Sequence, residues 1–209
     1  MRTSCGLVLV LAAALVAIPA TAQRGRGPRP PAVRGVFNPT IGSGAVYKTA
    51  NGEMEVSLVG KEDVNGKTGY WIQIGMGGQS NMKQLWVLDG KNMTIARTIV
   101  QAQGEGPMEM PPGMFGLSSM SSDARGDGQL VGTESVTTPA GTFSCEHYRA
   151  TNGKWDVWLA PNIPPWGLVK SKDETGEMVV QRVMTGVPDR ITGTPQKLEL
   201  PPGFSMPGR

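Results

Sequence analysis

The chain has 209 residues, of which 39% are hydrophobic, and it carries 20 Lys and Arg against 17 Asp and Glu with a single His. The formal charge of +3 is too small for a protein that relies on nucleic-acid binding, and one His excludes a multi-histidine zinc site within one chain. Glycine and proline, at 29 and 17 residues, exclude a helical bundle and favour one domain of short strands joined by turns.

The N-terminus has the three-part layout of a secretory signal. Arg2 precedes an apolar run at residues 7–18, and Pro19 leads into the small residues 20–22. The run of about 12 residues is shorter than the roughly 20 that a membrane-spanning helix needs. We therefore predict cleavage after Ala22 and an exported protein, periplasmic or secreted, that is not integral to the membrane. A retained membrane anchor is the alternative.

Cysteine usage follows from that cleavage. Cys5 lies before the apolar run, so it cannot be the lipid-modified cysteine of a lipoprotein signal, and it would leave with the signal. Cys145 then remains alone, so no intramolecular disulfide forms and an apolar core must hold the fold. A chain of this size can bury roughly 70% of its unfolded surface, which suffices without crosslinks.

The composition predicts four segments, beginning with the signal at residues 1–22. Residues 23–43, rich in Arg, Pro and Gly, form a flexible arm. This arm is attracted to anionic envelope polymers or lipid headgroups, or it is only a solvated linker. Residues 44–186 form the antiparallel β domain. Residues 187–209 are too rich in Pro and Gly to be core and are expected to fray.

The first strands of the β domain follow one another through short turns. Residues 53–58 alternate, which places Met54, Val56 and Leu58 on one face of a half-buried strand. Asn65-Gly66 is the preferred centre of a tight hairpin turn, because both positions tolerate positive φ. Further strands are predicted at 67–74, 82–88 and 93–100, with a turn at Asp89-Gly90. These four strands form an antiparallel meander.

Residues 101–126 interrupt this pattern with adjacent prolines and several methionines, which predicts a long Met/Pro-rich loop that acts as a lid or binding segment. Strands then resume at residues 129–137, 142–150, 155–159, 167–171 and 178–184. The predicted fold class is all-β, or β-rich α+β, with a curved antiparallel sheet or half-barrel.

Five short motifs in the second half form a recognisable pattern. They are Gly-Thr-Glu-Ser-Val at 132–136, Thr-Pro-Ala-Gly-Thr-Phe at 138–143, Cys-Glu-His-Tyr-Arg at 145–149, Asp-Val-Trp at 156–158 and Pro-Pro-Trp-Gly-Leu-Val-Lys at 164–170. They resemble the C-terminal signature of an uncharacterised group of secreted bacterial proteins, whose strand pattern is similar to that of the LolA/LolB lipoprotein carriers. The resemblance covers roughly residues 128–185. It implies a LolA-like curved sheet with a concave apolar face closed by a loop or helix, and it implies no catalytic residues.

The Met-rich loop holds one group of candidate binding residues. Met108, Met110 and Met114 are spaced by two and four positions. Thioethers are soft ligands suited to Cu(I), and methionine also adapts its shape to varied apolar ligands. A metal site, an apolar lid and plain packing all remain open. Five tryptophans exceed the 4 Phe and 3 Tyr in number, and Trp158 and Trp166 either line a cavity or are structural.

Cys145 and His147 are the candidates for nucleophilic chemistry, because they share a strand face at positions i and i+2. A neighbouring imidazolium can activate a thiol. However, side chains at this spacing are roughly 7 Å apart, whereas a working pair needs a hydrogen bond of about 3 Å. The pattern therefore predicts a buried structural thiol beside a structural His.

Acid/base chemistry has candidate carboxylates but no motif. A pair for glycoside hydrolysis would be drawn from Glu62, Glu134, Glu146 and Asp156. No serine-centred elbow, P-loop or dinucleotide-binding glycine fingerprint lies in the right strand–helix context.

We therefore expect an exported, non-enzymatic binding or envelope-accessory protein that holds an acyl chain or lipid anchor on a concave sheet, without a cofactor, metal or nucleic acid. Its partner is an apolar small molecule, a lipid or an envelope component. Cu(I) binding and an enzyme acting on envelope polymers are the alternatives. The expected ligand-binding side chains are Met108, Met110, Met114, Phe115, Met120, Trp158 and Trp166.

Overall fold

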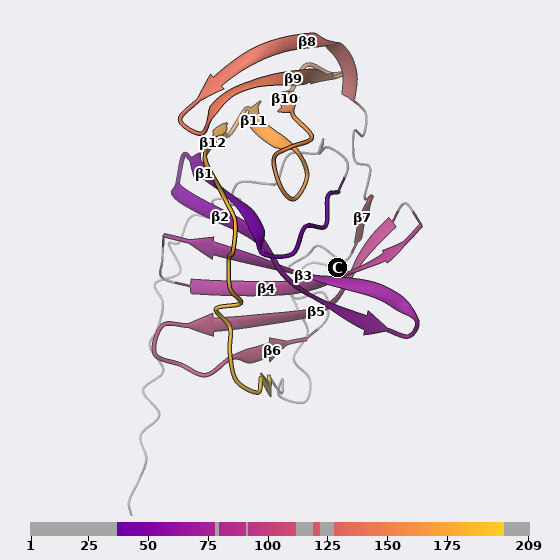
Figure 1. The fold of residues 1–209 in the computed structure, drawn as a ribbon, viewed down its shortest axis with the longest axis vertical. Coiled ribbons are helices and arrows are strands. Elements are labelled where there is room, and N and C mark those ends of the chain that lie inside the picture. The colour runs from indigo at the N-terminus through magenta and orange to yellow at the C-terminus, as the bar shows by residue number, and fades with distance from the viewer. Residues whose placement is uncertain (1–36, 78–79, 91, 112–118, 122–127, 199–209) are drawn as a thin grey trace, which may run out of the picture.

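The fold is a single curved, open sheet, and the prediction of an all-β antiparallel fold is confirmed (Figure 1). The computed structural model describes residues 37–77, 80–90, 92–111, 119–121 and 128–198. These residues contain strands and turns but no helix. Accordingly, no helix long and apolar enough to cross a bilayer is found within these ranges.

Within the described ranges the sheet contains thirteen strands, in the order β13-β6-β5-β4-β3-β2-β1-β12-β11-β10-β9-β8, with β7 pairing with β5 off this path. Their bounds are β1 (Ser43–Thr49), β2 (Gly52–Val64), β3 (Lys67–Met76), β4 (Ser80–Asp89), β5 (Asn92–Ala102), β6 (Met108–Met110), β7 (Ser119–Ser121), β8 (Gly128–Thr138), β9 (Gly141–Ala150), β10 (Trp155–Leu159), β11 (Leu168–Asp173), β12 (Gly176–Met184) and β13 (Gln196–Lys197).

Two meanders make up the sheet, and β1 joins them. Strands β2 to β5 follow in sequence order, and the β2–β3 hairpin turns at Asn65 and Gly66, whose φ values of 54° and 77° explain this residue pair. Strands β8 to β12 form the second meander. In β1, Ala45 faces Val56 on β2 and Val183 on β12, so this strand completes both meanders at once.

The main core covers one face of the sheet, which we call the core face. Val56, Leu58 and Ile72 cover it in the first meander, and Val157 and Val180 continue it in the second. Burying each such side chain contributes roughly 1.5–3 kcal/mol. Residues from outside the strands complete this core, namely Phe37, Ala160, Ile163 and Trp166.

The opposite face of the first meander is covered by residues 187–198, which we call the C-terminal strap (Figure 1, yellow). Ile191 is only 3% exposed and packs with Trp71, Leu85 and Ile99. The strap ends in β13, which pairs in parallel with β6. The prediction that the chain frays from residue 187 onward is therefore wrong as far as residue 198, because a buried side chain and strand pairing hold it.

Two further boundaries differ from the sequence prediction. Phe37 is buried and the Asn38 amide donates to the Pro165 carbonyl at 2.8 Å, so the folded unit begins before the predicted end of the arm at residue 43. The prediction that residues 101–126 form one long loop is wrong at two places, because β6 and β7 lie in this segment and both pair with β5. Glu109 in β6 is held by Arg97 of β5 at 3.0 Å, and this pairing keeps the pKa of Glu109 below its ordinary value.

Candidate functional site

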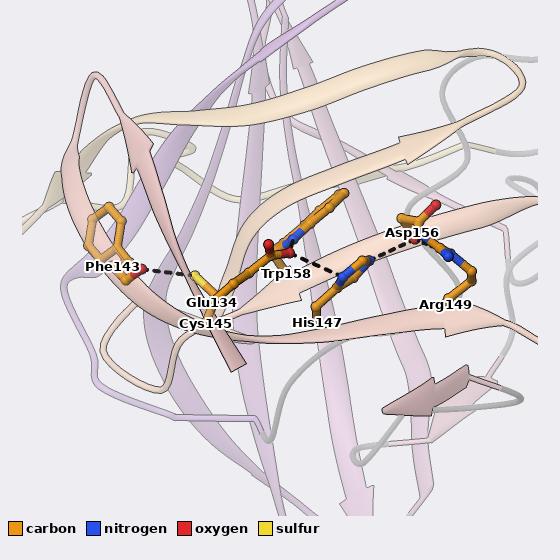
Figure 2. A network of polar contacts seen from close by, with 7 residues as sticks. All are labelled: Glu134, Phe143, Cys145, His147, Arg149, Asp156 and Trp158. Carbon is orange, nitrogen blue, oxygen red and sulfur yellow. Dashed lines mark hydrogen bonds and ion pairs between the residues drawn. The ribbon is translucent and has the colours of Figure 1, made fainter. Parts of the chain in front are cut away.

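His147 on β9 lies between two carboxylates from the neighbouring strands (Figure 2). Its Nδ1 is 3.1 Å from Glu134 Oε1 on β8, and its Nε2 is 2.7 Å from Asp156 Oδ1 on β10. Because carboxylates only accept hydrogen bonds, both ring nitrogens can donate here only when the imidazole is protonated. His147 is only 7% exposed, so both contacts lie in a largely buried part of the sheet.

Further groups complete this polar network on the face opposite the core face. Arg149 donates from Nε to Asp156 at 2.7 Å. Burial alone would raise the pKa of Asp156, but the hydrogen bonds from Arg149 and His147 outweigh it and lower that pKa. Trp158 stacks on His147 at 4.4 Å between ring centroids, and its indole N–H donates to Glu134.

The side chains of this network already have partners within it. Trp158 contacts His147 on β9 and has the Lys170 ammonium of β11 at 5.2 Å from its ring centroid. Both carboxylates that flank His147 contact its ring, and they also accept hydrogen bonds from Arg149 and Trp158. A carboxylate pair of this kind lacks a free acid or base, so the arrangement is better suited to holding β8, β9 and β10 together than to proton transfer.

Cys145 shares this face with His147, as the alternation of β9 predicts (Figure 2). The thiol donates to the Phe143 carbonyl at 3.6 Å and is fully buried. Burial, with the negative charge of Glu134 adding to it, raises the pKa of the Cys145 thiol to about 11. The thiol is therefore protonated at neutral pH and is a poor nucleophile.

We expect Cys145 to react with iodoacetamide at pH 8 about a hundredfold more slowly in the folded protein than in guanidinium, because only the thiolate attacks. The rate in the folded protein should rise only as the pH approaches about 11. The measurement uses the chain cleaved after Ala22, or a Cys5→Ser variant, so that Cys145 is the only thiol. Equal rates in the folded and unfolded states would contradict this assignment.

A pocket of about 630 Å³ opens on the core-face side of the second meander. Three segments line it: the start of the described chain, strands β8 and β9, and the connection from β10 to β11. Its lining residues are Phe37, Asn38, Pro39, Thr133, Ser144, Glu146, Leu159, Ala160, Pro161 and Gly167.

The β10–β11 connection forms one wall of the pocket, and its own backbone holds it in shape. The Ala160 amide donates to the Gly167 carbonyl at 2.7 Å, and the Gly167 amide donates to the Ile163 carbonyl at 2.6 Å. Gly167 has a φ of 76°, and a Cβ there would lie 2.9 Å from the Ala160 carbonyl oxygen. Only glycine fits this position without strain. The fully buried Ile163 anchors the connection in the core.

The predicted binding residues do not converge on this pocket. Met108 and Met110 face Val100 and Thr98, which places both thioethers, half-buried, on the core face at the other end of the sheet order. Trp166 is buried against Phe37, at 5.8 Å between ring centroids, so it supports a pocket-lining residue. Trp158 lies on the face of β10 that carries the His147 network, where it packs partly against the core, and not on the face that lines the pocket.

The remaining predicted residues are only partly placed. Met114 and Phe115 lie outside the described residues. The backbone of Met120 pairs with Met93, and its side chain lies outside the description. In the part of the chain that is described, no group of three or more His, Cys, Asp or Glu could hold a metal ion.

The sequence prediction missed the pocket because its walls are distant in the chain. The sequence offers Glu146 only as one of four candidate carboxylates, and the composition of residues 37–39 predicts that they belong to the arm. A signal was present, since Val36 and Phe37 interrupt the polar composition of that segment with apolar side chains.

Comparison with known proteins does not assign the chain to a family. No protein-family model and no curated protein matches it. Among solved structures, an exported-protein candidate with a YmcC-like fold from Bacteroides fragilis is similar over 73% of this chain and 100% of its own, with 15% identity and a TM-score of 0.39. A lipoprotein candidate from Parabacteroides distasonis covers 72% of this chain and 99% of its own, with 16% identity and a TM-score of 0.31. Both scores are low, so neither likeness bears on function, and the resemblance to LolA/LolB stays a prediction.

Proposed function

We propose that the protein is an exported, non-enzymatic binding protein that holds the apolar part of a small ligand, such as an acyl chain or lipid anchor, in the pocket on the core-face side of β8–β10. The proposal of export rests on the signal-like layout of residues 1–22. The pocket itself is the observation that supports binding, because its volume of about 630 Å³ lies in the usual range for small-molecule sites.

The chemistry of the pocket wall supports an apolar ligand. Phe37, Pro39, Leu159 and Pro161 contribute hydrophobic surface from two separate segments. Each methylene that such a wall removes from water contributes about 0.8 kcal/mol, so eight buried methylenes contribute roughly 6 kcal/mol before the cost of association. Because micromolar affinity needs about 8 kcal/mol, eight methylenes alone account for weak binding, and tighter binding needs a longer chain or polar contacts.

The test is a titration with dodecanol, an uncharged probe, followed by calorimetry or tryptophan fluorescence. We expect saturable binding to the wild type and loss of binding in Thr133→Trp, since an indole at this exposed lining position fills the pocket. The matched control is Thr68→Trp, at an exposed position on β3 in the first meander, which should bind as the wild type does. Absence of binding to the wild type, or equal binding by both variants, would contradict the proposal.

Native mass spectrometry of the protein isolated from its own host gives an independent check. A retained mass that matches a lipid or acylated species, and that is lost in Thr133→Trp, supports the proposed ligand class. A retained copper ion would instead favour the soft-metal alternative at the methionines.

A further inference from the structure

The polar side of the pocket contains a carboxylate. Among the described lining residues, Glu146 is the only ionisable side chain, and it is accompanied by the hydroxyls of Thr133 and Ser144 and the amide of Asn38. These described lining residues include no Lys, Arg or His. The described part of the pocket therefore combines an apolar wall with a negative charge.

The sheet register places Glu146 at the boundary between these two surfaces. On β9 it lies directly opposite Thr133 of β8 and opposite Leu159 of β10, so all three side chains share the core-face side. Its carboxylate has a hydroxyl on one side and an aliphatic side chain on the other. A ligand that contacts Glu146 can thus reach the apolar wall at once.

The Glu146 carboxylate is oriented by a hydrogen bond, but no residue that the structure describes acts as its counter-ion. The Tyr148 hydroxyl donates to Oε2 at 2.7 Å, which fixes one oxygen. Within the described ranges no Lys, Arg or His forms an ion pair with Glu146. The nearby carboxylates on the opposite face do have such partners, since Asp156 is paired with Arg149 and Glu134 contacts the His147 ring. The pocket therefore presents an unneutralised carboxylate.

We propose that the ligand of this pocket carries a protonated amine, which Glu146 binds, while its apolar part lies along Phe37, Pro39 and Leu159. This inference rests on the proposed function and specifies the chemical class of the headgroup. An ammonium supplies the hydrogen-bond donors that the free carboxylate oxygen lacks, and a charge-assisted hydrogen bond is stronger than a neutral one. A carboxylate or phosphate headgroup would be repelled by Glu146.

Three probes with the same chain test the headgroup: dodecylammonium, dodecanol and dodecanoate, each below its micelle concentration at pH 7 and low salt. We expect dodecylammonium to bind about tenfold more tightly than dodecanol, with dodecanoate the weakest. In Glu146→Gln the affinity for dodecylammonium should fall about tenfold, to that of dodecanol, while dodecanol binding stays unchanged.

The matched control is Glu53→Gln, which makes the same change of charge at an exposed position on β2 and should keep the tenfold preference. Equal affinities for the three probes, or a preference for dodecylammonium that survives Glu146→Gln, would overturn this inference while leaving the proposed function intact. Failure of all three probes to bind the wild type would instead overturn the proposed function.

Discussion

Asp189→Ala is expected to lower the free energy of unfolding by about 2–4 kcal/mol, because it leaves a mostly buried ammonium without its counter-ion. Lys83 Nζ lies 2.5 Å from Asp189 Oδ2 and 3.0 Å from the Ile191 carbonyl oxygen, which also accepts from it. The Lys83 side chain is 11% exposed and that of Asp189 is 36% exposed, so water only partly replaces the lost carboxylate. Urea denaturation of the wild type and the variant measures the difference.

Two controls separate the buried charge from other effects of the substitution. Asp89→Ala removes the partner of Lys67 from a pair whose side chains are 49% and 64% exposed, and it should cost less than about 1 kcal/mol. Adding Lys83→Met to Asp189→Ala should recover part of the lost stability, because the uncompensated charge is then removed. A double variant no more stable than Asp189→Ala alone would show that this ion pair is not the cause.

Ile191→Ala is expected to lower the free energy of unfolding by about 2–5 kcal/mol, the usual range for removing a buried aliphatic side chain. Ile191 is 3% exposed and fills the space above Trp71, Leu85 and Ile99. Ile41→Ala is the matched control, since that side chain is 45% exposed and should change stability by less than about 0.5 kcal/mol. The denaturation midpoints give both values, and similar losses in the two variants would contradict the packing of the C-terminal strap.

Local signals made the meanders predictable. The alternation at residues 53–58 and the Asn65-Gly66 pair concern residues that are close in the sequence, and both determine a hairpin without reference to the rest of the chain. Short strand-like segments at residues 129–184 likewise predict the strands of the second meander. Most observed strands begin or end at other residues than predicted, because pairing continues beyond the alternating segment. For example, β2 runs from Gly52 to Val64, whereas the alternation covers only residues 53–58.

Alternation alone does not predict the second face of the first meander. A half-buried strand at residues 53–58 would expose the side chains opposite Met54, Val56 and Leu58, yet Ser57 on that face is fully buried and Gln73 is 1% exposed. The C-terminal strap explains Gln73, whose side-chain carbonyl accepts from the Arg190 amide at 2.9 Å. These partners are 117 positions apart, so no window of the sequence contains both.

The candidate site depended even more on long-range geometry. The pocket brings residues 37–39 beside β9 and β10, and the sequence placed those residues in an arm. The contacts of His147 depend on the register of β8, where the pairing shifts between Leu130 and Gly132. A bulge of this kind moves every later side chain by one position, and composition does not reveal it.

The position of β1 between β2 and β12 also has a kinetic consequence. Tyr47 on this strand donates to the Leu168 carbonyl, 121 positions away, so the sheet is complete only when distant parts of the chain have met. Proteins with such high contact order fold slowly, because the entropy of closing a long loop is lost before the pairing compensates for it. The pairing of β1 with its two neighbours is therefore expected to limit the rate at which the whole sheet forms.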